Sequence, residues 1–335
     1  MEKIGVIGAG SWGTTLADLL AKKGHEVTLW VHNAERGEEM RRDRVNRTYI
    51  PELAFSPFLE ITSSLEQAVC GKDSILFATP SQMMRGVMLA ARPYVSEEAC
   101  VINASKGIEL ESLLTMSGVY QEIFPPKLAQ NYCVLSGPSF AREVAKELPT
   151  AIVAGAAHPA VSRYVQEIFS TSFFRVYTSC DVIGVELGGA IKNVISIAAG
   201  ICDGLGMGHN TRAALITRGL AEMARLGNAM GGRSATFAGL AGMGDLVLTC
   251  TGDLSRNRTV GMKLGGGMNL DEILSNMQMV AEGVKTTDSA RQLAKTLGVD
   301  MPITEKIYEI LYLEKTPRQA VIELMTRDLK AENDT

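Results

Sequence analysis

The chain has 335 residues, more than one ordinary hydrophobic core accommodates. Its formal net charge of −4 at pH 7 gives no reason to expect nucleic acid or an anionic membrane as a partner. Its six cysteines show no CxxC spacing and its four histidines no HExxH motif, so we expect no disulfide framework and no metal site. The first residues are not typical of a signal peptide, and no apolar run approaches the ~18 residues of a membrane span. We therefore expect a cytoplasmic protein of two domains.

The N-terminal elements predict a nucleotide-binding turn. The stretch KIGVIGAGSWG holds a short apolar strand and then the pattern G-x-G-x-x-G, formed by Gly8, Gly10 and Gly13. A helix over 14–23 and a second strand over 25–30 follow. This context predicts a Rossmann unit, in which bare glycine backbone approaches a pyrophosphate and the helix N-terminus stabilises its charge. The alternative is an ordinary βαβ turn without a nucleotide.

The end of the second strand bears on the choice between NAD and NADP. An acidic residue there usually hydrogen-bonds the 2′-hydroxyl of NAD. The sequence Trp30-Val31-His32-Asn33 contains no acid, so a 2′-phosphate would meet no repulsion. His32 and the nearby Arg36 favour NADP, although both are also consistent with solvated surface side chains.

Alternating strands and helices continue to about residue 177. Strands are predicted at 74–78, 100–103, 132–135, 150–154 and 173–177, and a helix at 82–91. Polar loops carrying Ser81, Lys106 and Ser139 follow three of these strands. Because ligands bind at the carboxyl ends of strands in open α/β sheets, we expect these loops to meet at one cleft. Taken alone, Lys106 is more simply a surface lysine.

From Asp181 onward helical patterns replace strands. We predict helices over 182–200, 211–230, 270–277, 285–297, 302–312 and 317–329. The fold class is therefore α/β for an N-terminal Rossmann-type domain at 1–180, followed by an all-α domain at 181–335.

The stretch GVELGGAIKNVISIAAG at 184–200 predicts a buried helix that carries Lys192. Gly188, Gly189 and Ser196 lie three or four residues from Lys192 and share its face of the helix. These small side chains favour a cleft in which a ligand approaches the ammonium group. The alternative is a salt-bridged lysine beside glycines at a helix crossing.

Two later segments also suggest chemistry. Asp245 either caps a short helix or presents a carboxylate to a cleft. Ser255 is a predicted N-cap, and Arg256 and Asn257 follow it. A helix N-terminus with a guanidinium and an amide suits a phosphate group, whereas the simpler interpretation is a cap with surface arginines.

These motifs in this order resemble NAD(P)-dependent sn-glycerol-3-phosphate dehydrogenases of the bacterial type over nearly the whole chain. The motifs are Gly8–Gly13, Ser105-Lys106-Gly107, Leu135–Ser139, Gly184–Asn193, Gly244-Asp245-Leu246 and Ser255-Arg256-Asn257. The resemblance implies a helical domain like the C-terminal domain of 6-phosphogluconate dehydrogenase. It also implies hydride transfer between NAD(P)H and dihydroxyacetone phosphate, giving sn-glycerol 3-phosphate for glycerophospholipid synthesis, and a homodimer built on the helical domain.

The resemblance also implies roles for individual residues. Lys192 is the implied acid/base, and the other implied catalytic residues are Lys106, Asn193 and Asp245. The implied substrate contacts are Lys106, Gly137, Ser139, Lys192, Asp245, Ser255, Arg256 and Asn257. The implied cofactor contacts are Gly8, Gly10, Ser11, Trp12, Gly13, His32, Asn33, Tyr49, Lys106, Ala141, Arg256, Val280 and Glu282. Apolar burial and the ammonium of Lys106 would both lower the pKa of Lys192 towards neutrality.

One departure leaves the cofactor open. Family members often carry His-Arg after the second strand, whereas this chain has His32-Asn33, so NAD, NADP or both fit. Two alternatives to the implied function also stay open. One is another lysine-dependent hydroxy-acid dehydrogenase of the same architecture, and the other is a nucleotide-binding sensor without catalysis.

Overall fold

The computed structural model describes residues 1–277, 279–329 and 331–332. It divides into two compact units: unit 1 comprises Met1–Lys106 and Leu114–Val185, and unit 2 comprises Gly107–Leu113 and Glu186–Thr335. The boundary predicted after residue 180 lies shortly before the end of unit 1. The predicted N-terminal domain also includes the segment Gly107–Leu113, which in the structure belongs to unit 2.

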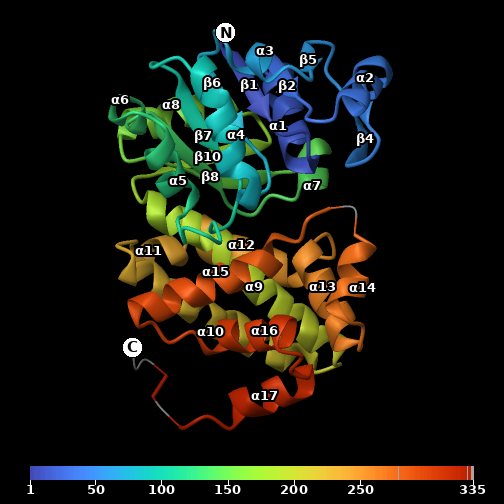
Figure 1. Ribbon diagram of the computed structural model, residues 1–335, viewed down its shortest axis with the longest axis vertical. Helices are drawn as coiled ribbons and strands as arrows, with labels where there is room; N and C mark the ends of the chain where they lie inside the picture. Colours follow the sequence, from blue (N-terminus) through green and yellow to red (C-terminus); the bar gives the residue numbers. More distant parts are fainter. Residues whose placement is uncertain (278, 330, 333–335) are drawn as a thin grey trace. The chain divides into compact units, whose positions relative to one another are not determined.

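Unit 1 is built on an eight-stranded sheet of order β10-β9-β8-β7-β6-β1-β2-β5 (Figure 1). The strands are β1 (Lys3–Ile7), β2 (Glu26–Trp30), β5 (Leu59–Thr62), β6 (Ser74–Phe77), β7 (Cys100–Asn103), β8 (Tyr132–Ser136), β9 (Thr150–Gly155) and β10 (Phe174–Ser179), beside a hairpin of β3 (Val45–Asn46) and β4 (Ile50–Ala54). From β5 to β8 all neighbours are parallel, which is the Rossmann strand order. The order reverses between β1 and β6, where such sheets bind ligands.

The strand β9 pairs with β8 in the antiparallel direction. Its carboxyl end therefore lies at the opposite edge of the sheet from the ends of β6, β7 and β8, and so does that of its parallel neighbour β10. The sequence did not show this reversal, nor did it predict β5. Leu59–Thr62 is a short edge strand that pairs only with β2 in this sheet, so its pattern is brief and partly polar.

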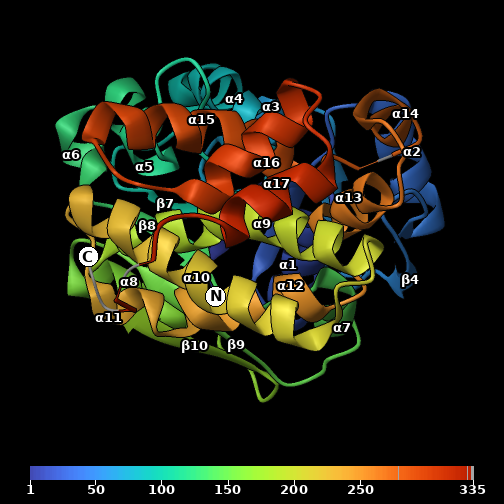
Figure 2. The ribbon, with the colours of Figure 1, turned by 90° about the horizontal axis from the view of Figure 1, so that it is seen from below.

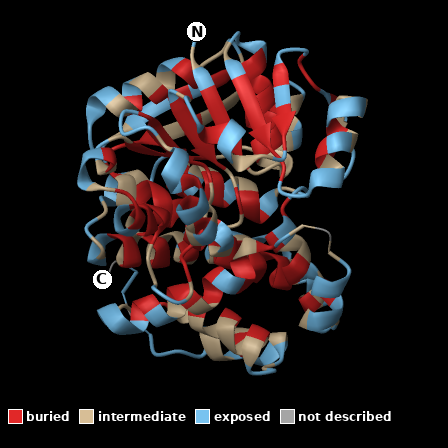
Figure 3. Cartoon of the chain, turned by 45° about the horizontal axis from the view of Figure 1, so that its top comes forward, coloured by how far each residue is buried: buried red, intermediate tan, exposed pale blue. Residues whose placement is uncertain are grey.

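The helices of unit 1 cover the sheet in two layers. They are α1 (Ser11–Lys22), α2 (Ala34–Asp43), α3 (Leu65–Val69), α4 (Met84–Ala91), α5 (Met116–Ile123), α6 (Pro126–Ala129), α7 (Ala141–Ala145) and α8 (Pro159–Phe169). In one layer α1 contacts α7 and α8, and in the other α4 contacts α3 and α5. The strands between them are largely buried (Figure 3). The helix expected from Thr14 begins at Ser11, because Gly10 is its extended N-cap.

Unit 2 is helical. Its helices are α9 (Val182–Gly204, which begins in unit 1), α10 (Gly208–Ala229), α11 (Ser234–Phe237), α12 (Asp245–Thr251), α13 (Arg256–Gly265), α14 (Leu270–Ser275), α15 (Glu282–Leu297), α16 (Pro302–Tyr312) and α17 (Pro317–Met325). The helix α9 runs among the others (Figures 1 and 2). It is long and apolar enough to cross a membrane, contrary to our expectation, but 89 % of that window is buried inside the protein, which identifies a core helix.

Glycines set the crossing of α9 and α13. A Cβ atom added to Gly200 would lie 2.1 Å from the carbonyl oxygen of Arg258, and one added to Gly261 would lie 2.0 Å from that of Ile197. The two backbones therefore touch without side chains between them. This close crossing fixes the N-terminus of α13, which begins after Ser255, against α9.

Candidate active site

The three glycines of the N-terminal loop have different roles. Gly8 adopts φ +117°, which disfavours any other residue. A Cβ on Gly13 would lie 1.9 Å from the carbonyl oxygen of Gly8, whereas a Cβ on Gly10 would meet no protein atom within 4 Å. The fold therefore requires the first and third glycines but not the second. Bare backbone at Gly10 fits the close approach of a pyrophosphate, so the loop fits a dinucleotide.

The first turn of α1 is suited to an anion. Its N-cap is Gly10, which makes no side-chain capping bond, and the N–H groups of such a turn carry a partial positive charge. Ser11 and Trp12 lie in this turn, and the Trp12 ring lies 6.4 Å from that of Phe174. Ala141, at the start of α7, accepts a hydrogen bond of 3.4 Å from the Thr15 hydroxyl.

A buried asparagine that sequence reasoning missed holds the loop in place. Asn46 Nδ2 donates to the carbonyl oxygen of Ala9 and to the Thr14 hydroxyl, both at 3.0 Å. Its Oδ1 accepts from the backbone N–H of Tyr49 at 3.2 Å. The only sequence signal for this role is a polar residue between two turn segments, which is too common to interpret.

The end of β2 places two predicted cofactor residues, His32 and Asn33, and Arg36 connects this segment to a third, Tyr49. Asn33 caps α2, since its Oδ1 accepts from the N–H of Arg36 at 2.8 Å. The Arg36 guanidinium lies over the Tyr49 ring at 5.1 Å and donates to its hydroxyl at 3.3 Å. His32 packs edge-on against Trp30, with 5.5 Å between ring centroids.

The loops after β6, β7 and β8 are linked to one another, as the sequence predicts. Lys106 Nζ and the Ser139 hydroxyl donate to the carbonyl oxygen of Gly137, at 3.2 and 3.0 Å. The Ser105 hydroxyl donates to the carbonyl oxygen of Thr79 at 2.5 Å. Ser81, two residues after Thr79, begins a short 3-10 helix and is buried.

In unit 2, Lys192 forms a buried ion pair. Its ammonium donates to Asp245 Oδ1 at 2.5 Å and to the Thr249 hydroxyl at 2.8 Å. The exposed fractions of Lys192 and Asp245 are 8 % and 1 %. The salt-bridged lysine that the sequence leaves open as an alternative is therefore present, with Asp245 as its carboxylate.

The position of Asp245 depends on a π-helical turn at Leu240–Gly244. Such turns are frequent at functional sites. Asp245 is the first residue of α12, and the N-cap of this helix is Gly244 without a side-chain bond. Of the two interpretations left open for Asp245, the capping one is therefore wrong. A Cβ on Gly188 would lie 2.4 Å from the Ala241 carbonyl oxygen. This backbone, rather than a ligand, therefore fills the space beside Gly188.

Hydroxyl groups connect the lysine cluster to α13. Ser196 donates to the Thr249 carbonyl oxygen at 2.9 Å and lies 3.0 Å from the Ser255 hydroxyl. Ser255 accepts from the N–H of Arg258 at 3.2 Å, which confirms it as the N-cap. Sequence reasoning missed Thr249, although it lies one turn after Asp245 on the same helix.

Asn193 is joined to the start of α15. Asn257 Nδ2 donates to Asn193 Oδ1 at 2.8 Å, and the N–H of Gly283 donates to Asn257 Oδ1 at 3.0 Å. Arg256 Nη1 donates to the carbonyl oxygen of Val280 at 2.8 Å. These contacts gather residues from α9, α13 and the start of α15, where Glu282 is the first residue.

The predicted site residues thus fall into one group in each unit. Unit 1 holds Gly8, Gly10, Ser11, Trp12, Gly13, His32, Asn33, Tyr49, Lys106, Gly137, Ser139 and Ala141. Unit 2 holds Lys192, Asn193, Asp245, Ser255, Arg256, Asn257, Val280 and Glu282. Within the described part of the chain, no three His, Cys, Asp or Glu side chains gather as metal ligands do.

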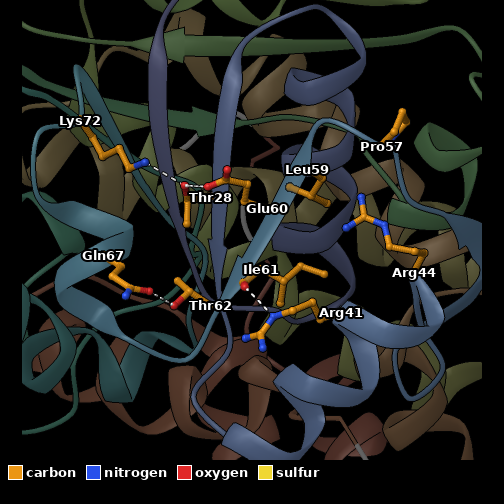
Figure 4. Close-up of a pocket in the computed structure, with 10 residues that line it drawn as sticks. All are labelled: Thr28, Arg41, Arg44, Pro57, Leu59, Glu60, Ile61, Thr62, Gln67 and Lys72. Carbon is orange, nitrogen blue, oxygen red and sulfur yellow. Dashed lines mark hydrogen bonds between the residues drawn. The ribbon is translucent and has the colours of Figure 1, made fainter.

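A pocket of about 470 Å³ in unit 1 contains none of these residues (Figure 4). It lies at the β5 edge and is lined by Thr28, Arg41, Arg44, Pro57, Leu59, Glu60, Ile61, Thr62, Gln67 and Lys72. Its cations contact the protein's own atoms: Arg41 donates to the Ile61 carbonyl oxygen at 3.3 Å, and Lys72 to the Thr28 hydroxyl at 2.8 Å. Charged side chains of this kind protect an edge strand from pairing.

Comparisons with known proteins agree with this architecture. Residues 3–162 match the family model described as NAD-dependent glycerol-3-phosphate dehydrogenase N-terminus, and residues 181–322 match that of the C-terminus. A curated glycerol-3-phosphate dehydrogenase [NAD(P)+] of Geobacter sulfurreducens is 63 % identical over 331 residues, covering 99 % of each chain. That of Geobacter metallireducens is 64 % identical over the same length and coverage.

A solved structure shows the same likeness. The crystal structure of glycerol-3-phosphate dehydrogenase from Coxiella burnetii has a TM-score of 0.93 and 40 % sequence identity, and covers 97 % of this chain and 99 % of that one. The likeness therefore extends through both units rather than to the dinucleotide-binding unit alone.

Proposed function

The chain belongs to the NAD-dependent glycerol-3-phosphate dehydrogenase family, and we propose that Lys192 carries the proton transfer of the family's reaction. The protein is an oxidoreductase that uses NAD(P) to interconvert dihydroxyacetone phosphate and sn-glycerol 3-phosphate. The observation that supports the role of Lys192 is its buried ammonium, held by Asp245 and Thr249. Lys192 is thus a positioned acid rather than a mobile surface lysine.

The residues of unit 1 hold the dinucleotide. The open backbone at Gly10 and the N-terminus of α1 receive the pyrophosphate, and the residues after β2 receive the adenosine ribose. When bound, the nicotinamide supplies the hydride in the reductive direction. Lys106 adds a positive charge to the loops after β7 and β8, where Gly137 and Ser139 offer polar atoms to the substrate.

The ammonium of Lys192 protonates the C2 oxygen of dihydroxyacetone phosphate during reduction and recovers the proton in the reverse direction. Asp245 and Thr249 fix the direction of this group, so no reorientation is needed at the moment of transfer. Asp245 stabilises the positive charge before transfer. Asn193, held by Asn257, offers an amide to a substrate hydroxyl.

The substrate phosphate binds at the start of α13. This helix has 10 residues and begins after the N-cap Ser255, so its first turn carries a partial positive charge. Arg256 is exposed at this point and adds a guanidinium, which suits phosphate. Arg256 also donates to Val280, which places it beside the predicted cofactor residues Val280 and Glu282 of the same unit.

Two further proposals concern the whole protein. We expect a homodimer formed through unit 2, because Leu313, Ile322 and Met325 near the C-terminus are exposed apolar side chains. We also expect the protein to work in the cytoplasm in the reductive direction, supplying glycerophospholipid synthesis. Sedimentation of the purified chain at several concentrations tests the dimer, and a monomer at all of them would contradict it.

Oxidation of NADH and of NADPH with dihydroxyacetone phosphate, followed at the nicotinamide absorbance, tests the assigned reaction. Turnover with at least one cofactor is expected, with sn-glycerol 3-phosphate as the product. Tight dinucleotide binding without turnover would contradict the assignment. That result would favour a hydroxy-acid dehydrogenase with another substrate, or a sensor.

A further inference from the structure

After β2, the backbone of Arg36 is held by Asn33, the residue that departs from the family pattern. Family members often have an arginine at position 33, whereas Asn33 here accepts from the N–H of Arg36 at 2.8 Å and caps α2. An N-cap of this kind fixes the first helical turn. The asparagine thus does not supply a cation itself, but it orders the turn from which Arg36 projects.

The side chain of Arg36 is positioned by an aromatic ring. Its guanidinium lies over Tyr49 at 5.1 Å, and its Nη1 donates to the Tyr49 hydroxyl at 3.3 Å. The N–H of Tyr49 donates to Asn46, which in turn donates to the carbonyl oxygen of Ala9. A continuous series of contacts within unit 1 therefore links the guanidinium to the glycine loop.

The chemistry of this place selects between the two dinucleotides. The loop after β1 receives the pyrophosphate, and the end of β2 receives the adenosine ribose. Residues 30–33 contain no acid to accept a bond from a ribose 2′-hydroxyl. A guanidinium binds phosphate through paired N–H donors, and its planar fork can do so while stacked on a ring.

We propose that Arg36, stacked on Tyr49, binds the 2′-phosphate of NADP in place of the arginine that the family often has at position 33. This inference rests on the dinucleotide binding assigned to unit 1 above. It makes Arg36 the residue that sets the preference between NADP and NAD, and it gives Tyr49 a positioning role.

Binding of two adenine nucleotides tests this without catalysis. Adenosine 2′,5′-bisphosphate and 5′-AMP differ only in the 2′-phosphate, and their dissociation constants can be measured by calorimetry on the full chain. We expect Arg36→Gln to weaken the bisphosphate by about 10-fold or more, as for loss of a charged hydrogen bond, and 5′-AMP by less than about twofold. The ratio of kcat/KM for NADPH to that for NADH should fall by the same factor as the bisphosphate affinity.

Arg42→Gln is the matched control, because Arg42 lies on the same helix and pairs with Asp43 at 2.8 Å. It should change neither affinity. Tyr49→Phe keeps the ring but removes the hydroxyl, so we expect a smaller loss of bisphosphate affinity, about threefold.

Three outcomes would overturn the proposal. Equal weakening of both nucleotides by Arg36→Gln would mean that Arg36 only supports Tyr49 and the loop. An unchanged affinity for the bisphosphate would mean that another cation binds the 2′-phosphate. A wild-type chain that binds neither nucleotide would overturn the dinucleotide site of unit 1 itself, and this inference with it.

Discussion

The glycine loop of unit 1 and the lysine cluster of unit 2 are assembled in opposite ways. The loop is formed by consecutive residues, and its shape follows from which of them are glycine. The cluster joins Lys192 to Asp245 and Thr249, which lie 53 and 57 residues further along the chain. The first site can therefore be read from a short pattern, whereas the second exists only once α9 and α12 have packed together.

Glycines in the two regions also differ in what surrounds them. A Cβ added to Gly10 would meet no protein atom within 4 Å, whereas a Cβ added to Gly188 would lie 2.4 Å from the Ala241 carbonyl oxygen in the π-helical turn. The same residue type thus serves ligand approach in one place and helix packing in the other. Sequence alone predicts ligand approach for Gly10, but for Gly188 it leaves ligand approach and a helix crossing open, and the structure shows backbone packing there.

The largest expected effect comes from removing the ammonium of the cluster. Lys192→Met should lower kcat by about 10³-fold or more, because general acid catalysis contributes about 10²- to 10⁴-fold and positioning adds to it. The dissociation constant for NADH, measured by fluorescence, should change by less than about twofold, because Lys192 is not among the predicted cofactor contacts.

The control for this variant addresses the charge left behind. Loss of the lysine leaves Asp245 buried without its cation, which itself destabilises a protein. The double variant Lys192→Met/Asp245→Asn removes both charges and should recover thermal stability but not turnover. Recovery of turnover in the double variant would show that Lys192 serves folding rather than catalysis.

Two alanine substitutions in the glycine loop separate ligand binding from folding. Gly10→Ala should weaken NADH binding by about 10-fold or more while the melting temperature stays within about 2 °C, since the added Cβ meets only the space for the pyrophosphate. Gly13→Ala should lower the melting temperature, since its Cβ would collide with the Gly8 carbonyl oxygen. Unchanged NADH binding in a well-folded Gly10→Ala protein would place the dinucleotide elsewhere.

Two neighbouring arginines of α13 test the phosphate site. Arg256→Ala should raise KM for dihydroxyacetone phosphate by about 10-fold, as for one lost charged hydrogen bond, with a smaller change in kcat. Arg258 instead pairs with Asp203 at 2.8 Å, so Arg258→Ala should mainly lower stability. Steady-state kinetics and thermal melting distinguish the two, and an unchanged KM in Arg256→Ala would move the phosphate site away from α13.

The smallest expected effect on turnover concerns a buried carboxylate outside both sites. Glu222 accepts from the N–H groups of Ile303 and Thr304 at 2.5 and 3.1 Å. Burial, which outweighs these bonds, raises its pKa to about 7 from 4.5. Because the folded pKa lies above the unfolded one, its stabilising contribution is complete below pH 4.5 and is lost as the pH rises through about 7.

Glu222→Gln removes this titration. The free energy of unfolding of the wild type relative to the variant should therefore decrease between about pH 5 and about pH 8, as measured by urea denaturation across this range. Turnover at neutral pH should be unaffected. A difference in stability that does not vary with pH would contradict the raised pKa.

Local patterns predicted the order of most elements but not every strand. The first strand, the glycine turn and the second strand were visible because each has its own period and punctuation. The edge strand β5 was missed because four residues with a mixed polar pattern do not distinguish a strand from a loop. The reversal of β9 was also missed, because strand direction leaves no mark on the residues of the strand itself.

The sequence predicted which residues form the candidate site more fully than it predicted the contacts between them. Lys192 and Asp245 were both expected, and a salt-bridged lysine was one of the two interpretations left open, but the residues alone did not identify Asp245 as its partner. Of the two roles left open for Asp245, the capping role is filled by Gly244. Thr249 and Asn46 were missed, and Ser196 was expected only as a small side chain beside Lys192, because a single buried polar residue has no local signature until its partner is known.

The sequence by itself determined where the first loop turns, because a backbone at φ +117°, as at Gly8, disfavours any residue other than glycine whatever surrounds it. Only the tertiary structure decided which partner each buried polar group meets. Hydrophobic burial brings helices together without direction, and the contact of α9 with α12 and α13 then selects the carboxylate and hydroxyl that hold Lys192. For this reason the lysine was predictable as a residue and its surroundings were not.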